Sequence, residues 1–150
     1  MTGIVTRRRG TISLLLAAAI ALLGPAADQA AEAGTAGDVR SLINAERVES
    51  GKRALRRSGK LSRIARRHSI RMARQNYLHH NGRLGYQARK MSWTVLGENV
   101  GVGTSVSSLH RAFMNSAPHR ANVMKGRYRR VGVGTVQSGG RLWVTVVFAN

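Results

Sequence analysis

The chain has 150 residues, which is enough for one domain but short for two. It carries 25 lysine and arginine residues against 6 acidic ones, a formal net charge of +19 at pH 7. Its surface therefore favours anionic partners such as wall polymers, lipid headgroups, nucleic acid or acidic proteins. The absence of cysteine excludes disulfides and thiolate chemistry, and limits any metal site to histidine and carboxylate ligands.

The first 33 residues have the order of a secretory signal peptide. Three arginines at 7–9 precede an uncharged apolar run at 11–24, and an A-x-A sequence follows at 31–33. The run is shorter than the roughly 20 residues that span a bilayer, which favours a cleaved signal over a membrane anchor. We expect Sec-type export to the extracellular space or cell wall, with cleavage after Ala33. No transmembrane helix is expected in the mature chain, whose net charge would be +18 after losing three arginines and two acids.

Beyond the signal, a flexible lead-in is expected at 34–37 and one domain at 38–150. Asp38 can act as the N-cap of a first helix that continues to about Gly51. The apolar residues of this helix recur at helical spacing: Val39, Leu42, Ile43 and Val48.

A second helix is predicted after Ser58, a suitable N-cap. Its apolar stripe is Leu61, Ile64, Ala65, His68 and Met72. Its other face is strongly basic and comprises Lys60, Arg63, Arg66, Arg67, Arg71 and Arg74. Such a face is usually solvated, but it is also the candidate surface for an anionic polymer.

Residues 76–96 lack a clear period and indicate a loop, with a short strand near Trp93. A third helix is predicted to begin at Thr104 or Ser105 and to end before Pro118. Its buried stripe is Val106, Leu109, His110 and Phe113. For both His68 and His110, a packed imidazole bonded to a backbone group is the favoured interpretation.

The last quarter of the chain changes to the period of β-strands. Residues 129–137 and 141–149 are rich in β-branched residues and are joined by a glycine turn, which predicts a hairpin. Gly132 and Gly134 precede no helix, so we interpret them as packing or bulge glycines rather than a phosphate-binding loop. Three helices followed by a hairpin indicate an α+β fold.

Three polar residues at the ends of predicted elements form a candidate site: His80, Glu98 and His119. Two imidazoles and a carboxylate suit Zn²⁺ with an open water position. The carboxylate could instead orient an imidazole or act as a general base. Their spacings match no local metal motif, so the residues alone also allow Glu98 to be an ordinary loop acid. No G-x-S-x-G sequence supports a serine hydrolase.

Six motifs then occur in a familiar order, from Val39 to Phe148: LINAERVESGKRAL, LSRIARRHSIRMARQNYLHHN, GENVG, FMNSAPHRANVM, YRRVGVGTV and WVTVVF. In this order they resemble a secreted bacterial domain of the CAP superfamily. This is the SCP-like group of cysteine-rich secretory, antigen 5 and pathogenesis-related-1 proteins. The resemblance implies an α-β-α sandwich, with helices packed on a central antiparallel sheet.

The resemblance also implies a cleft lined by two histidines and two glutamates, in which the histidines can hold a divalent metal such as zinc. The motifs place the histidines at His80 and His119 and one glutamate at Glu98. The second glutamate is replaced by Ser116, and the preceding tryptophan by Phe113. Three of the four positions are therefore kept, without the second acid.

Members of the family have been tied to lipid binding, protease-like activity, wall roles and signalling, so the fold does not select a function. We predict a secreted binding module whose cleft takes a metal or small ligand and whose basic face contacts wall polymer or lipid. The alternative is a zinc-dependent hydrolase with Glu98 as base; the missing acid favours binding over catalysis. A nucleic-acid-binding or antimicrobial protein ranks last, because only the arginine content supports it.

Overall fold

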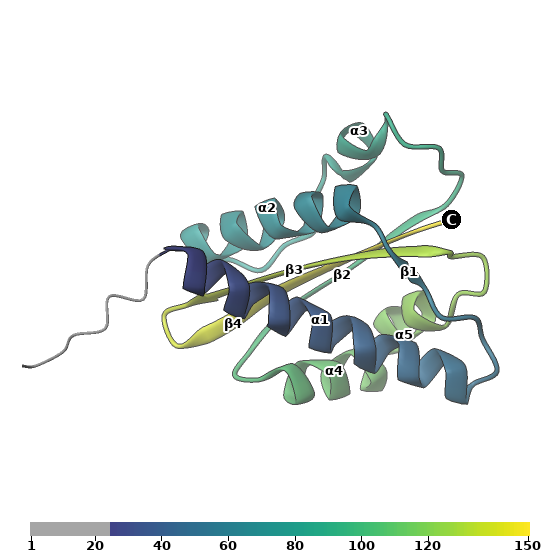
Figure 1. Cartoon of the computed structure of the whole chain (residues 1–150), viewed down its shortest axis with the longest axis horizontal. Helices are drawn as coiled ribbons and strands as arrows, with labels where there is room; N and C mark the ends of the chain where they lie inside the picture. The colour runs from purple at the N-terminus through teal and green to yellow at the C-terminus, as the bar shows by residue number, and fades with distance from the viewer. Residues whose placement is uncertain (1–24) are drawn as a thin grey trace, which may run out of the picture.

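The molecule is a three-layer arrangement in a computed structural model that describes residues 25–150 (Figure 1). The helices are α1 (Pro25–Glu49), α2 (Gly59–Gln75), α3 (Leu84–Ala88), α4 (Val106–Asn115) and α5 (Ala117–Met124). The strands are β1 (Arg56–Arg57), β2 (Leu96–Gly103), β3 (Arg130–Ser138) and β4 (Arg141–Ala149). They form one sheet in the order β1-β3-β4-β2. All pairings are antiparallel except the short β1–β3 pair, so the sheet is mixed.

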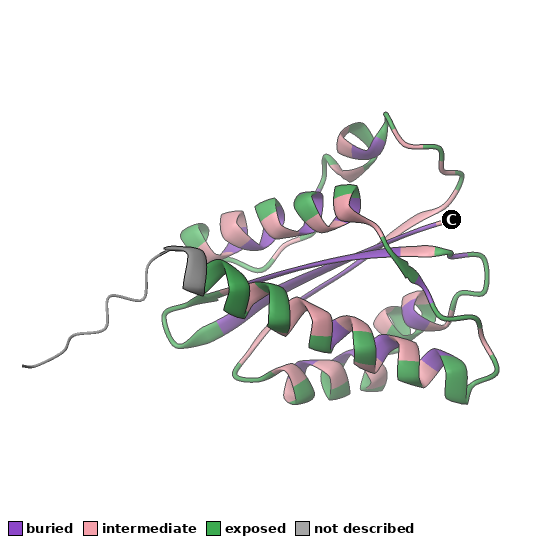
Figure 2. Cartoon of the chain, viewed as in Figure 1, coloured by how far each residue is buried: buried purple, intermediate pink, exposed green. Residues whose placement is uncertain are grey.

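The two faces of the sheet are covered by different helices. Figure 2 shows β3 and β4 buried along most of their length. Alternate residues of β4 contact opposite layers, as the two-residue period of a strand requires. One set packs with α1 and α4 in the main core: Leu142, Val144, Val146 and Phe148. The other set includes Val147 and Ala149, which pack with Leu61 and Ala65 of α2. The predicted α+β sandwich is confirmed.

Helix α2 lies directly on the backbone of β3 because two glycines leave room for it. A Cβ on Gly132 would lie 2.2 Å from the carbonyl carbon of Leu61, and one on Gly134 would lie 2.1 Å from the amide nitrogen of Arg66. These distances are far below van der Waals contact. The interpretation of both residues as packing glycines is confirmed.

The N-terminal part of the structure differs from the expectation. Helix α1 begins at Pro25, so Asp38 is not its N-cap, and residues 34–37 are helical rather than a flexible lead-in. The alanine-rich sequence of this segment favours a helix, and the hydroxyl of Thr135 donates to the carbonyl of Glu32. Most of the predicted signal peptide falls on residues 1–24, which lie outside the described part, so the signal peptide and its cleavage after Ala33 stay predictions. None of the described helices meets the length and hydropathy required to cross a bilayer.

Four elements were predicted correctly: α2 with its Ser58 cap, α4 with its Ser105 cap, and the two strands of the hairpin. The region 76–96 was less well predicted, because α3 lies within it and no strand forms near Trp93. Strand β2 was missed, since its glycines break the apolar alternation on which a strand prediction depends. Helix α4 ends at Asn115, before Pro118 as expected, but Pro118 does not stop further regular helix: it lies in the first turn of α5, where its missing N–H costs nothing.

The substitution Gly134→Ala should destabilise the fold by about 3 kcal/mol, because the added methyl group forces α2 away from β3. The free energy of unfolding in urea measures this. Gly126→Ala is the matched control, since no atom lies within 4 Å of a Cβ there. Equal stability of the two variants would contradict the close approach of α2.

Candidate functional site

The site is built around β2, an edge strand of the sheet. Glu98 pairs with Val147 of β4. Its side chain points to the α2 side, as does that of Val100, which packs with Met72 and Trp143. The intervening Asn99 therefore points to the side of α4 and α5. Residues from both layers can thus meet at this edge.

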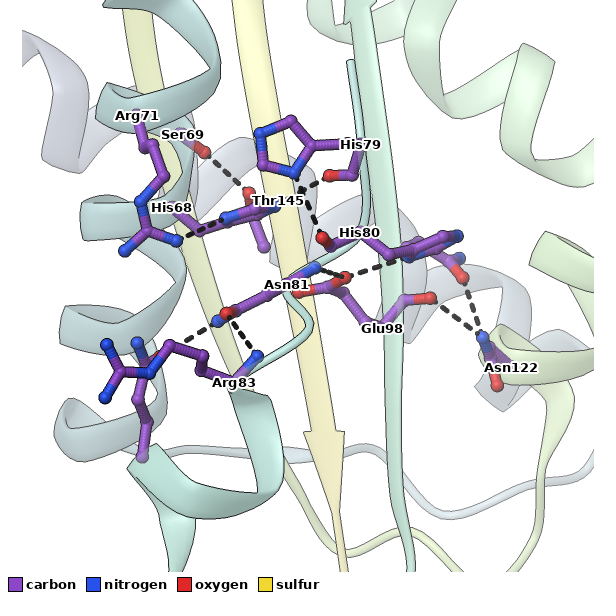
Figure 3. A network of polar contacts seen from close by, with 12 residues as sticks. His68, Ser69, Arg71, His79, His80, Asn81, Arg83, Glu98, Asn122 and Thr145 are labelled. Carbon is purple, nitrogen blue, oxygen red and sulfur yellow. Dashed lines mark hydrogen bonds and ion pairs between the residues drawn. The ribbon is translucent and has the colours of Figure 1, made fainter. Parts of the chain in front are cut away.

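Glu98 is a buried carboxylate that holds the loop after α2. Its Oε1 atom accepts hydrogen bonds from the backbone N–H of Asn81 and from Nδ1 of His80, each at 2.9 Å (Figure 3). The Glu98 side chain is 6% exposed, whereas that of His80 is 67% exposed. With Nδ1 donating to the carboxylate, the second ring nitrogen of His80, Nε2, is the one free to accept or to bind a metal.

His119 approaches from the opposite layer, on α5. Its backbone carbonyl accepts from Nδ2 of Asn99 at 3.0 Å. The centroid of its ring lies 5.2 Å from that of Phe113, the residue that replaces the family's tryptophan. Burial lowers the pKa of His119, and repulsion from His80 lowers it further.

Two asparagines fix α5 to the edge strand. Nδ2 of Asn122 donates to the carbonyl of Glu98 at 3.1 Å and to Oδ1 of Asn99 at 2.9 Å (Figure 3). The hydroxyl of Tyr128 donates to Oδ1 of Asn122 at 3.4 Å. Since Asn99 also bonds the backbone of His119, this chain of amides sets the position of the second histidine relative to Glu98.

Ser116, at the position of the family's second glutamate, joins α4 to α5. Its backbone is extended, with φ −92° and ψ 117°, and its side chain makes no capping hydrogen bond to α5. It is partly buried, three positions before His119. A serine here cannot supply the negative charge of a carboxylate, so Glu98 is the acid that the site retains.

The metal-binding potential of the site lies with the two histidines. Within residues 25–150, no three histidine, aspartate or glutamate side chains gather as a metal-binding group. Glu98 is engaged by His80 and Asn81, which suits a supporting carboxylate behind a histidine ligand. Nε2 of His80 and the imidazole of His119 are the groups that would hold a metal at this site.

Comparison with known proteins decides the family. The sequence profile of the "Cysteine-rich secretory protein family" (CAP) matches residues 40–148. The chain belongs to the CAP family. It contains no cysteine, in spite of the family's descriptive name.

Several bacterial proteins are similar to this CAP domain. "Uncharacterized protein YkwD" of Bacillus subtilis is 33% identical over 108 residues, 67% of this chain and 42% of that protein. An extracellular SCP-domain protein from Bacillus anthracis aligns with a TM-score of 0.76 and 22% identity, over 85% of this chain and 44% of that one. An outer surface protein of Borrelia burgdorferi aligns with a TM-score of 0.68 and 16% identity, over 76% of this chain and 90% of that one. The chain thus spans less than half of the two Bacillus proteins, and the structural likenesses show the fold.

His68 of the CAP domain contacts His79, in the loop that carries His80. This buried imidazole donates from Nε2 to the carbonyl of His79 at 2.7 Å, and its ring meets that of His79 edge-on. Burial lowers the pKa of His68. The packed, backbone-bonded histidine predicted at this position is confirmed, and it holds the loop that carries His80. His110 differs from the expectation, because its Nε2 bonds the carboxylate of Glu46 at 3.1 Å rather than a backbone group.

Asn81 and Tyr128 contribute to the site but were not predicted from the sequence. Asn81 acts through its backbone N–H, which carries no signal of residue type. The adjacent histidine pair in LHHN was the only local sign that this loop is functional. Asn99 and Asn122 each donate to a backbone carbonyl, and they also bond each other.

Asn122→Ala should lower the free energy of unfolding by about 1–3 kcal/mol, because the buried carbonyl of Glu98 and amide of Asn99 lose their partner. Urea unfolding measures the change. Asn115→Ala, at an exposed position, should change it by less than about 0.5 kcal/mol. An Asn122 variant as stable as this control would contradict the bridging role.

The lowered pKa of His119 predicts a loss of stability in mild acid. The unfolded chain protonates this residue near 6.5, whereas the folded chain resists the proton. The stabilising contribution is therefore complete above pH 6.5 and is lost as the pH falls below it. Urea unfolding between about pH 8 and 5 should show this decline, with a shallower slope in His119→Asn. An NMR titration giving His119 a pKa at or above 6.5 would contradict the prediction.

Proposed function

We propose that this protein is an exported CAP-domain binding module whose histidine site, formed by His80, Glu98 and His119, holds a divalent metal such as zinc or a small ligand. The hydrogen bond between Oε1 of Glu98 and Nδ1 of His80 carries the proposal. It fixes the imidazole with Nε2 available, and a carboxylate in this place raises the basicity of a ligating histidine.

The geometry favours binding over acid–base catalysis. Oε1 of Glu98 already accepts two hydrogen bonds, so Oε2 is the one oxygen left for a base, and its burial limits its access to water. A general base needs a carboxylate oxygen within hydrogen-bond reach of the water that it activates. Ser116 stands where a second acid would be and cannot take that role at neutral pH.

A zinc-dependent hydrolase is the second candidate, supported by one observation. Oε2 of Glu98 is buried without a hydrogen-bond partner among the described residues. An unpaired carboxylate oxygen beside His80 is a group that could receive a proton from metal-bound water.

Export and an anionic partner complete the proposal. The signal-like sequence at 1–33 and the similarity to an extracellular protein and an outer surface protein support a place outside the cell. The net charge, +18 for a chain cleaved after Ala33, supports contact with an anionic wall polymer or lipid surface.

Zinc titration by calorimetry tests the histidine site. The protein should bind one zinc ion, His80→Ala and His119→Ala should remove the binding, and Glu98→Gln should weaken it by about 10–100-fold. His110→Ala is the matched control and should bind as the wild type does. Wild type without zinc binding, or His80→Ala with unchanged affinity, would overturn the metal site.

The same variants separate the two candidates. A hydrolase requires that Glu98→Gln lose peptide or ester cleavage completely while zinc, at saturating concentration, is still bound. A binding module requires only that Glu98→Gln weaken the binding of zinc.

A further inference from the structure

A groove of about 740 Å³ runs between α1 and α2 across the free part of the β3 edge. In Figure 1 the two helices diverge on either side of β3 at this place. Its lining includes four arginines: Arg40 of α1, Arg57 of β1, and Arg63 and Arg66 of α2. Glu32 is the only acid among its lining residues. We call this the arginine groove.

One carboxylate already occupies the arginine groove. Oε2 of Glu32 accepts hydrogen bonds from Nε of Arg66 at 3.0 Å and from its Nη2 at 2.5 Å. The backbone carbonyl of the same residue accepts from Oγ1 of Thr135 at 2.8 Å. Thr135 is 2% exposed and lies on the floor of the groove. The groove thus presents a guanidinium and a buried hydroxyl to an anionic group.

This occupant belongs to the segment that the sequence marks for removal. Glu32 precedes the predicted cleavage after Ala33, so a cleaved chain loses both the carboxylate on Arg66 and the carbonyl on Thr135. The Arg66 side chain is 44% exposed, and an arginine fork suits carboxylate and phosphate oxygens. The cleaved protein therefore keeps Arg66 and Thr135 without the internal carboxylate, and the lining of the groove loses Gln29, Glu32 and Ala33.

We propose that the arginine groove binds the carboxylate or phosphodiester groups of an anionic polymer, and that Glu32 fills the same position until the N-terminal segment is removed. The inference rests on the proposed function only for export and for an anionic partner. A polymer fits better than a single ion, because Arg57 and Arg63 are exposed and extend the positive surface beyond Arg66.

The arginine groove is independent of the histidine site. It lies on the β3 side of the sheet, whereas His80, Glu98 and His119 lie at β2, the opposite edge in the order β1-β3-β4-β2. Substitutions in one site can therefore be tested without disturbing the other.

The first experiment uses the chain secreted and cleaved by its producing cell, with the new N-terminus read by mass spectrometry. Binding to polyglycerol phosphate, to polygalacturonate and to neutral dextran is measured at low salt. The double variant Arg63→Gln/Arg66→Gln should lose at least about tenfold in affinity for one or both polyanions, since each arginine neutralises part of the bound charge. The matched control is Arg111→Gln/Arg127→Gln, which removes the same charge from exposed positions outside the groove.

The second experiment uses the uncleaved full chain. Glu32→Gln should raise its affinity for the same polymers, whereas Asp28→Asn, which removes an equal charge outside the groove, should raise it less. Circular dichroism of every variant confirms that the fold is intact.

The outcomes separate the two proposals. If the cleaved wild type binds neither polyanion, the anionic partner fails and the inference fails with it. If it binds, but both double variants lose affinity equally, or Glu32→Gln matches Asp28→Asn, the arginine groove is overturned while the proposed function stands. Zinc titration should be unchanged in the groove variants. The polymer whose affinity falls in Arg63→Gln/Arg66→Gln shows whether the bound anion is a carboxylate or a phosphodiester.

Discussion

The contact between α2 and the bare backbone of β3 is the constraint on which both candidate sites depend. Gly132 and Gly134 let the helix descend until its backbone meets the strand. At that depth the hydroxyl of Ser69 reaches the carbonyl of Gly134 and the hydroxyl of Thr145. The helix is thereby fixed along its axis as well as in depth. The first half of α2 positions Arg63 and Arg66 in the arginine groove. Its second half positions His68 against the loop that carries His80.

A buried carboxylate at an edge strand imposes a second constraint. A carboxylate taken out of water needs hydrogen-bond donors in place of the water that it has lost. The backbone of Asn81 and the ring of His80 supply them, so the loop must adopt one conformation. On the other layer, Asn99 and Asn122 tie α5 to the same strand. The two histidines are thus carried by elements that are fastened to a single strand from opposite faces.

The parts of the fold that sequence reasoning predicted are those with a strong local period. The apolar stripe of α2 and the alternation of the hairpin are of this kind. Strand β2 was missed because Gly101 and Gly103, which make room for Leu109 of α4, replace the apolar residues that would have marked it. The early start of α1 depends on contacts with Arg66 and Thr135, far away in sequence. The three site positions came from their places at the ends of predicted elements and from motif order, whereas the role of Glu98 as the partner of His80 needed coordinates.

The amide of Asn122 has a consequence beyond positioning the site. The edge of a sheet offers unpaired carbonyls on which a foreign strand can add, and natural proteins cover or block such edges. By donating to the carbonyl of Glu98, Asn122 occupies one of these positions on β2, and α5 lies beside it. The polar residues that build the histidine site therefore also act as a barrier to self-association through this edge. The same few hydrogen bonds thus position the candidate site and cover part of the sheet edge.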